Sequence, residues 1–230
     1  MAVACLLPRL DARLRSSLQP AVWRRFSSAK KTQPNRKTAE PSFARRYLPD
    51  NASTFFKGGS GLLVTTPENR QFLLQHGIEP DNGKMKQFRA GSDSRGIASK
   101  YGVSLAFSPQ HVLHPYDLRF FDPKGHPLAH KARVDYARKV RDHPLWIMTT
   151  TISTASPVVK NLTKRRLVAG LHRALEDLGY DLAPGLGRSR EIRGTFWISM
   201  FNPAQASANP PEEFGKAIAA ALDALHGRER

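Results

Sequence analysis

The chain has 230 residues, 36 Lys or Arg against 19 Asp or Glu, and a formal net charge of +17, with a pI of about 10.6. This length holds one ordinary domain plus tails, or at most two small domains. So large a charge attracts polyanions, of which RNA and anionic membrane surfaces are the usual ones. The sequence contains no run of about 18 apolar residues, so it predicts no membrane-spanning helix.

The first 29 residues have the composition of a mitochondrial presequence. Arginines alternate with leucines and serines, and Asp11 is the only acid. Arg24 stands where a matrix peptidase reads arginine, so we expect cleavage after Phe26 and a mature protein in the mitochondrial matrix. The alternative is a basic N-terminal tail of a cytosolic protein. Because Cys5 is the only cysteine, the mature chain would contain no disulfide and no thiolate metal ligand.

Residues 30–56 form a polar, basic segment that we expect to be extended. Prolines interrupt it, and it carries too little apolar surface to fold alone. It is either a solvated linker or an extension that orders against a partner. Arg45 and Arg46, near its end, are candidate RNA contacts.

From residue 57 to residue 230 we predict a single domain of the α/β or α+β class, with helices packed on a small mixed sheet. A short helix is predicted over 67–76, because Thr66 can cap it, Pro67 can begin it and Gly77 can end it.

A glycine-containing loop is predicted over residues 81–100. Its basic residues Lys84, Lys86 and Arg89 are candidate RNA contacts, although a solvated surface loop is the commoner explanation of such a run. Phe88 and Tyr101, at its ends, suit base stacking. Three elements should follow, namely strands over 103–107 and 116–121 and a helix over 129–142.

The core of the domain is a predicted β-α-β-α unit over residues 145–227. Residues 145–153 are rich in β-branched and aromatic side chains, which suit a strand. Ser156 and Pro157 then begin a helix that ends before Gly179. A second strand is expected over 195–201, a loop over 202–208, and a last helix that Asn209 caps.

Cations gather on this central unit. Arg165, Arg166 and Arg173 fall outside the apolar stripe of the predicted helix. The loop after it contributes three more candidate RNA contacts, Arg188, Arg190 and Arg193. The pattern indicates a surface that binds something anionic.

Catalytic chemistry is not indicated. Serine, histidine and aspartate occur, but no Gly-x-Ser-x-Gly elbow brings them together, and the histidines lack metal-ligand spacing. Three of them, His114, His126 and His143, each precede a proline, which is typical of turns and strand starts. We therefore expect no enzyme activity, no small-molecule substrate, no metal and no cofactor.

The leader, the basic extension and the small basic α/β core together resemble mitochondrial ribosomal proteins, particularly those of fungi. The resemblance lies in the organisation of the whole chain and implies a structural component that binds mitochondrial rRNA and neighbouring ribosomal proteins. Two alternatives remain. One is a mitochondrial RNA-processing, translation or assembly factor that binds RNA transiently, and the other is a peripheral subunit of an inner-membrane complex.

Overall fold

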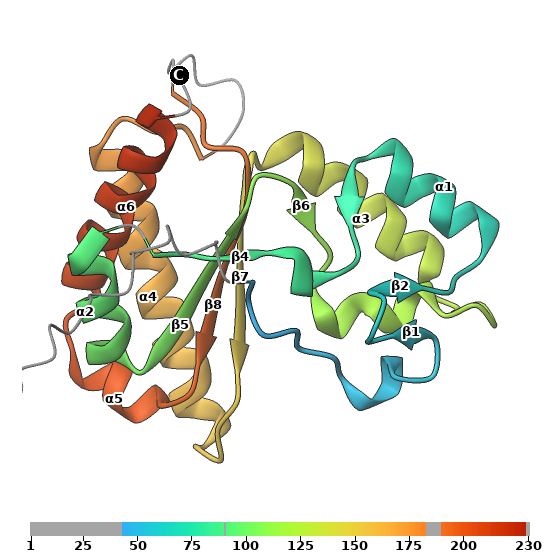
Figure 1. Cartoon of the computed structure of the whole chain (residues 1–230), viewed down its shortest axis with the longest axis horizontal. Coiled ribbons are helices and arrows are strands. Elements are labelled where there is room, and N and C mark those ends of the chain that lie inside the picture. The colour runs from blue at the N-terminus through green and yellow to red at the C-terminus, as the bar shows by residue number, and fades with distance from the viewer. Residues whose placement is uncertain (1–42, 90, 183–189, 229–230) are drawn as a thin grey trace, which may run out of the picture. The chain divides into compact units, whose positions relative to one another are not determined.

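The computed structural model describes residues 43–89, 91–182 and 190–228 (Figure 1). The leader predicted over 1–29, the first part of the segment 30–56, and Arg188 lie outside the described residues. Helices and strands combine in a mixed α/β fold, which confirms the predicted class.

A four-stranded mixed sheet forms the centre, in the order β4-β5-β8-β7. Strand β4 (Lys86–Gln87) is antiparallel to β5 (Val103–Ser108), and β5 is antiparallel to β8 (Gly194–Met200). Strand β8 runs parallel to β7 (Leu145–Thr151). Two parallel neighbours need a crossover connection, and the long helix between them supplies it.

Helices cover one face of the sheet, as Figure 1 shows. They are α2 (Gly91–Tyr101), α4 (Pro157–Asp177), α5 (Pro203–Ala208) and α6 (Pro211–Arg228). Because side chains alternate along a strand, Phe196, Ile198 and Met200 of β8 enter this core, while Trp197 between them points to the other face. There its indole Nε1 donates to Thr150 Oγ1 at 3.0 Å.

A second layer packs on that other face, around Trp146 of β7. Its helices are α1 (Pro67–Gln75), α3 (Ala129–Asp142) and the 3-10 helices η1 (Asp50–Ala52), η2 (Asn82–Lys84) and η3 (Pro115–Phe121). Its strands are the antiparallel pair β1 (Phe56–Lys57) and β2 (Leu62–Leu63), and the parallel pair β3 (Ile78–Glu79) and β6 (His111–Val112).

The end of the predicted basic segment lies on this layer. Phe43 forms a bridge with Lys86, and the Ala44 N–H donates to the Met85 carbonyl at 2.8 Å. Further on, Phe55 and Phe56 are buried in the core of the second layer.

Helices α4 and α6 touch backbone to backbone, because a glycine stands on each at the crossing. A Cβ atom added at Gly215 would overlap the Gly170 carbonyl group, and one at Gly170 would overlap the Pro211 carbonyl oxygen. This close approach buries Leu171 and Phe214 completely. Ordinary side chains would hold the axes 8–10 Å apart, which is the usual distance.

Most predicted elements of the central unit are confirmed. The Ser156 hydroxyl accepts from the Val159 N–H at 3.4 Å, Pro157 begins α4, and Gly179 after it has φ 80°. Helix α3 spans the predicted residues 129–142, and Thr66 caps α1 by accepting from the Asn69 N–H.

Three predicted segments are wrong. Residues 81–100 are not a loop but contain η2, β4 and most of α2, and residues 116–121 form part of η3 rather than a strand. The 3-10 turn begins where His114 Nδ1 accepts from the Tyr116 N–H, at 3.3 Å. Residues 203–208 are helical because Asn202 accepts from the Gln205 N–H at 3.1 Å and so caps α5.

The proposed stacking aromatics are also wrong. Phe88 lies edge-on to Phe196 in the core, and Tyr101 is fully buried against Phe214 with its hydroxyl donating to the Pro210 carbonyl. Neither ring is available to a base.

We expect Gly215→Ala to lower the free energy of unfolding by about 2 kcal/mol. The new methyl forces the helices apart, and this overpacking outweighs the roughly 1 kcal/mol that alanine gains over glycine within a helix. Gly96→Ala in α2 is the matched control, because nothing lies within 4 Å of its added Cβ. The control should raise stability, so urea unfolding of the two variants should shift in opposite directions. Two shifts of the same sign would contradict the packing argument.

Candidate functional site

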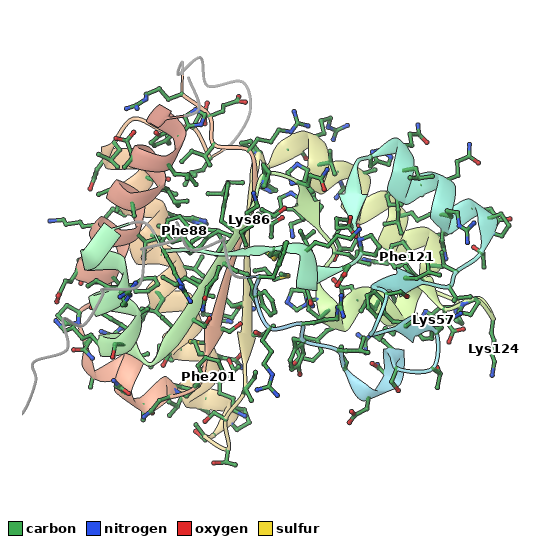
Figure 2. All side chains as sticks on the ribbon, in the orientation of Figure 1. Lys57, Lys86, Phe88, Phe121, Lys124 and Phe201 are labelled. Carbon is green, nitrogen blue, oxygen red and sulfur yellow. The ribbon has the colours of Figure 1, made fainter. Side chains whose placement is uncertain are left out.

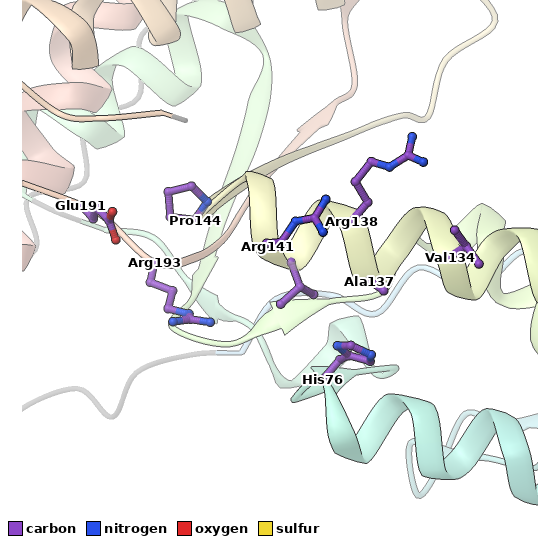
Figure 3. Close-up of a pocket in the computed structure, with 9 residues that line it drawn as sticks. His76, Val134, Ala137, Arg138, Arg141, Pro144, Glu191 and Arg193 are labelled. Atoms are coloured by element: carbon purple, nitrogen blue, oxygen red, sulfur yellow. The ribbon is translucent and has the colours of Figure 1, made fainter. Parts of the chain in front are cut away.

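A groove of about 710 Å³ lies along α3 and the segment that leads into β8 (Figure 3). Three arginines line it, Arg138 and Arg141 from α3 and Arg193 from just before β8. The other lining residues are His76, Val134, Ala137, Val140, Pro144 and Glu191. The groove lining thus combines apolar side chains with three arginines.

Local structure brings these arginines together. Arg138 and Arg141 are one helical turn apart and share a face of α3. Arg193 precedes Gly194, whose φ is 131° and whose N–H donates to the Pro144 carbonyl at 3.0 Å. A Cβ at Gly194 would overlap the Ser108 carbonyl oxygen, so only glycine lets the chain pass here. The bond to Pro144 ties the start of β8 to the end of α3.

The groove is electropositive. Within the described residues Arg138 and Arg193 make no ion pair, and Glu191 is the only acid in the lining. Arg141 does contact Asp142, at 2.8 Å, but its side chain is 76% exposed. An ion pair so open to water contributes little and yields readily to a better anion.

His111 lies buried behind this groove. Its ring stacks on Trp146, with centroids 4.3 Å apart, and neither ring nitrogen has a hydrogen-bond partner within the described residues. Burial lowers the pKa of His111 to about 4, and the charges of Arg193 and Lys139 add to the shift, against a smaller opposing effect of the Gly194 backbone. The ring is therefore neutral in the fold.

A second titratable cluster stands beside Trp146 and is internally satisfied. The Tyr136 hydroxyl donates to Asp117 Oδ2 at 2.7 Å, and the Lys139 Nζ lies 4.3 Å from the centre of the Trp146 ring. Burial lowers the pKa of Lys139, while Asp117 opposes that shift. These contacts join α3 to η3 and β7, so the cluster has a structural role.

The predicted arginines of α4 are exposed but do not all share one face. Arg166 and Arg173 line a hollow of about 480 Å³ beside the turn between α5 and α6, and Arg166 Nη1 donates to the Ser207 carbonyl at 3.1 Å. Arg165 points roughly 100° away around the helix, by its 3.6-residue turn.

Three of the predicted RNA contacts have acidic partners inside the fold. Arg46 makes two bonds of 2.7 Å to Asp81, Lys84 lies 2.8 Å from Glu79, and Arg190 lies 2.6 Å from Asp223. Asp81 is buried, which raises its pKa, but the bonds from Arg46 and the Gly83 N–H outweigh burial and hold that pKa below its usual value. Each of these three cations therefore links its own segment to the segment that carries its acidic partner.

Arg45, Lys86 and Arg89 remain at the surface. Arg89 donates to the neutral Gln87 Oε1 at 2.6 Å and makes no ion pair among the described residues. With Arg95, Arg89 lines a shallow hollow of about 440 Å³ beside β5.

Sequence reasoning missed Arg138, Arg141 and His76. The helix over 129–142 was predicted, and Arg138 and Arg141 stand one turn apart in its sequence, so a signal for the first two was present. The sequence could not show that the Gly194 N–H donates to the Pro144 carbonyl, 50 residues earlier in the chain. This hydrogen bond brings Arg193 to the groove beside α3.

No family model, curated protein or solved structure matches the chain. Among the described residues, no group of three or more His, Cys, Asp or Glu is placed to hold a metal ion. The helices described here include none with the length and apolar character needed to cross a bilayer.

We expect His111 to make the fold sensitive to acid. Because its pKa is lowered from 6.5 to about 4, the unfolded chain binds the proton first, and stability falls as the pH drops through that interval. The loss attributable to this ring is roughly 3 kcal/mol, at 1.36 kcal/mol per pKa unit.

His111→Phe should keep the stacking on Trp146 and remove that part of the loss, measured by urea unfolding between pH 7 and pH 4. His130→Gln, at an exposed position on α3, serves as the control and should unfold as the wild type does. An unchanged pH dependence in His111→Phe would show that the ring is not the source.

Proposed function

We propose that this protein binds RNA, with the sugar–phosphate backbone lying in the groove lined by Arg138, Arg141 and Arg193. The observation that carries the proposal is the convergence of these arginines from two distant segments on one hollow that contains a single acid. Arginine forks bind phosphate oxygens in pairs, and the released counterions supply affinity without any base code. The apolar side chains of Val134, Ala137 and Pro144 accept the ribose or a base edge.

The distribution of the other cations supports a large, folded RNA rather than a small anion. Exposed arginines also stand on α4, at Arg165 and Arg173, and beside β5, at Arg89 and Arg95. These surfaces belong to different elements from those of the groove, so one small ligand could not use them together. A ribosomal RNA, which surrounds its proteins, would contact several at once.

We further propose that the RNA is mitochondrial rRNA and that the protein is a structural component of the mitochondrial ribosome. The support is the leader-like composition of residues 1–29, the basic segment behind it and the basic domain, which together resemble such proteins. The competing proposal is a processing or translation factor that binds the same RNA only transiently.

The groove arginines should determine the salt dependence of RNA binding. Each phosphate contact contributes roughly 0.7–0.9 to the slope of log affinity against log salt. Replacing Arg138, Arg141 and Arg193 by alanine should therefore flatten the slope by about two to three units, in fluorescence anisotropy titrations with labelled RNA from about 50 to 300 mM KCl. Replacing Arg165, Arg166 and Arg173 tests the second surface in the same way.

A charge-matched control separates local contacts from net charge. Lys57, Lys124 and Lys216 are exposed and lie on separate segments, and the first two are labelled in Figure 2. Their triple alanine variant has the same net charge as the groove variant but should keep a nearly wild-type slope. Equal losses in the two triple variants would mean that the RNA senses only overall charge, and the groove assignment would be wrong.

Association with the ribosome is tested on a sucrose gradient of mitochondrial lysate. We expect the wild-type protein to co-migrate with one ribosomal subunit at physiological salt and the groove triple variant to move to the light fractions. A wild-type peak confined to the light fractions would favour the transient factor.

A further inference from the structure

Four of the twelve exposed large hydrophobic side chains within the described residues gather at one end of the sheet. Ile152 follows β7, Phe201 follows β8, and Val158 and Leu162 stand one turn apart at the start of α4. Their exposed fractions run from 49% to 74%. We refer to these four residues as the apolar apex.

Backbone contacts tie together the chain segments that carry these residues. The Ile152 N–H donates to the Met200 carbonyl at 2.9 Å, so Ile152 lies beside Phe201. The Thr163 hydroxyl donates to the Pro203 carbonyl at 3.3 Å, which joins the first turns of α4 to the chain that follows Phe201. In Figure 1 the loop between β7 and α4 projects beyond the strand ends, and Figure 2 labels Phe201 at the same end.

The chain around the apex contains cations but no acids. No Asp or Glu occurs between Asp142 and Glu176, or between Glu191 and Glu212. Lys160, Lys164 and Arg165 follow within the first three turns of α4, and the first turn of that helix carries no acid against its positive end. The apex is therefore apolar and electropositive.

We propose that the apolar apex docks on an anionic lipid bilayer surface. Apolar side chains on a projecting loop and helix start can enter the headgroup region of a flat membrane, while lysine and arginine reach the lipid phosphates. Three of the four side chains are aliphatic and offer no stacking platform for bases, which disfavours RNA here. The N-terminal 50 residues hold 11 Lys or Arg against 3 Asp or Glu, so charge repulsion disfavours them as the occupant.

This membrane contact is separate from the RNA groove, because the groove lies at the other ends of the same strands. Pro144 and Arg193, which line the groove, precede β7 and β8, whereas Ile152 and Phe201 follow them. A variant of the apex should therefore leave the affinity for RNA unchanged, and failure of one proposal does not decide the other.

The test is co-sedimentation of the full chain with phosphatidylcholine vesicles that contain about 20 mol % cardiolipin, against vesicles of phosphatidylcholine alone. The wild type should bind the anionic vesicles. Val158→Ser combined with Leu162→Ser should reduce the bound fraction on the order of tenfold, since these side chains supply buried apolar area. Leu74→Ser combined with Leu128→Ser is the matched control, because both leucines are exposed elsewhere and should not contribute.

Two outcomes would overturn the proposal. If the apex variant binds like the wild type, the vesicles attract net charge alone. If the wild type does not bind the anionic vesicles, the bilayer assignment fails and an acidic, amphipathic segment of a partner protein becomes the better occupant. Unchanged urea unfolding and RNA affinity of the apex variant would show that any loss is specific.

Discussion

The contact between Gly170 and Gly215 is the constraint on which the rest of the helical layer depends. It sets α4 and α6 close enough to bury Leu167, Leu171 and Phe214 between the helices and the sheet. It also fixes the rotation of α4, because a helix with glycine facing its neighbour must present the opposite side to solvent. The exposed side carries Arg165 and, nearer the start of the helix, Val158 and Leu162 of the apolar apex. A packing requirement thus decides which α4 side chains a partner can reach.

On the other face of the sheet, Trp146 is the residue on which the packing of the second layer depends. Its indole Nε1 donates to the His143 carbonyl at 3.1 Å, its ring stacks on His111, and Lys139 lies over it. One side chain therefore holds β6, the end of α3 and β7 together. The arrangement buries a histidine whose ring nitrogens have no hydrogen-bond partner among the described residues, which is unfavourable and is tolerated because stacking and packing surround it. Because α3 ends beside Trp146, the positions of Arg138 and Arg141 in the groove depend on the same contacts.

What the sequence could predict was mostly local. Helix α4 was predictable because Ser156, Pro157 and Gly179 mark its ends within a few residues of the apolar stripe. Helix α2 was not, because glycine and serine are weak helix formers and its stability comes from Ile97 and Tyr101 in the distant core. The α5 signal was present in Asn202 and Pro203, although the segment 202–208 was predicted to be a loop. The arginines show the same limit, since nothing in the sequence distinguishes Arg45 at the surface from Arg46, whose partner Asp81 lies 35 residues away.

The two proposed surfaces follow from one topological fact, the parallel pairing of β7 and β8. Parallel strands bring both amino ends to one edge of the sheet and both carboxyl ends to the other, and seven residues at about 3.3 Å each separate those edges by roughly 20 Å. The groove with Arg193 occupies the first edge, and the apolar apex with Phe201 occupies the second. At ordinary ionic strength the Debye length is about 8–10 Å, so the charge at one edge is largely screened from the other. RNA at the groove would therefore not repel a bilayer from the apex, and the groove and the apex can be occupied at once.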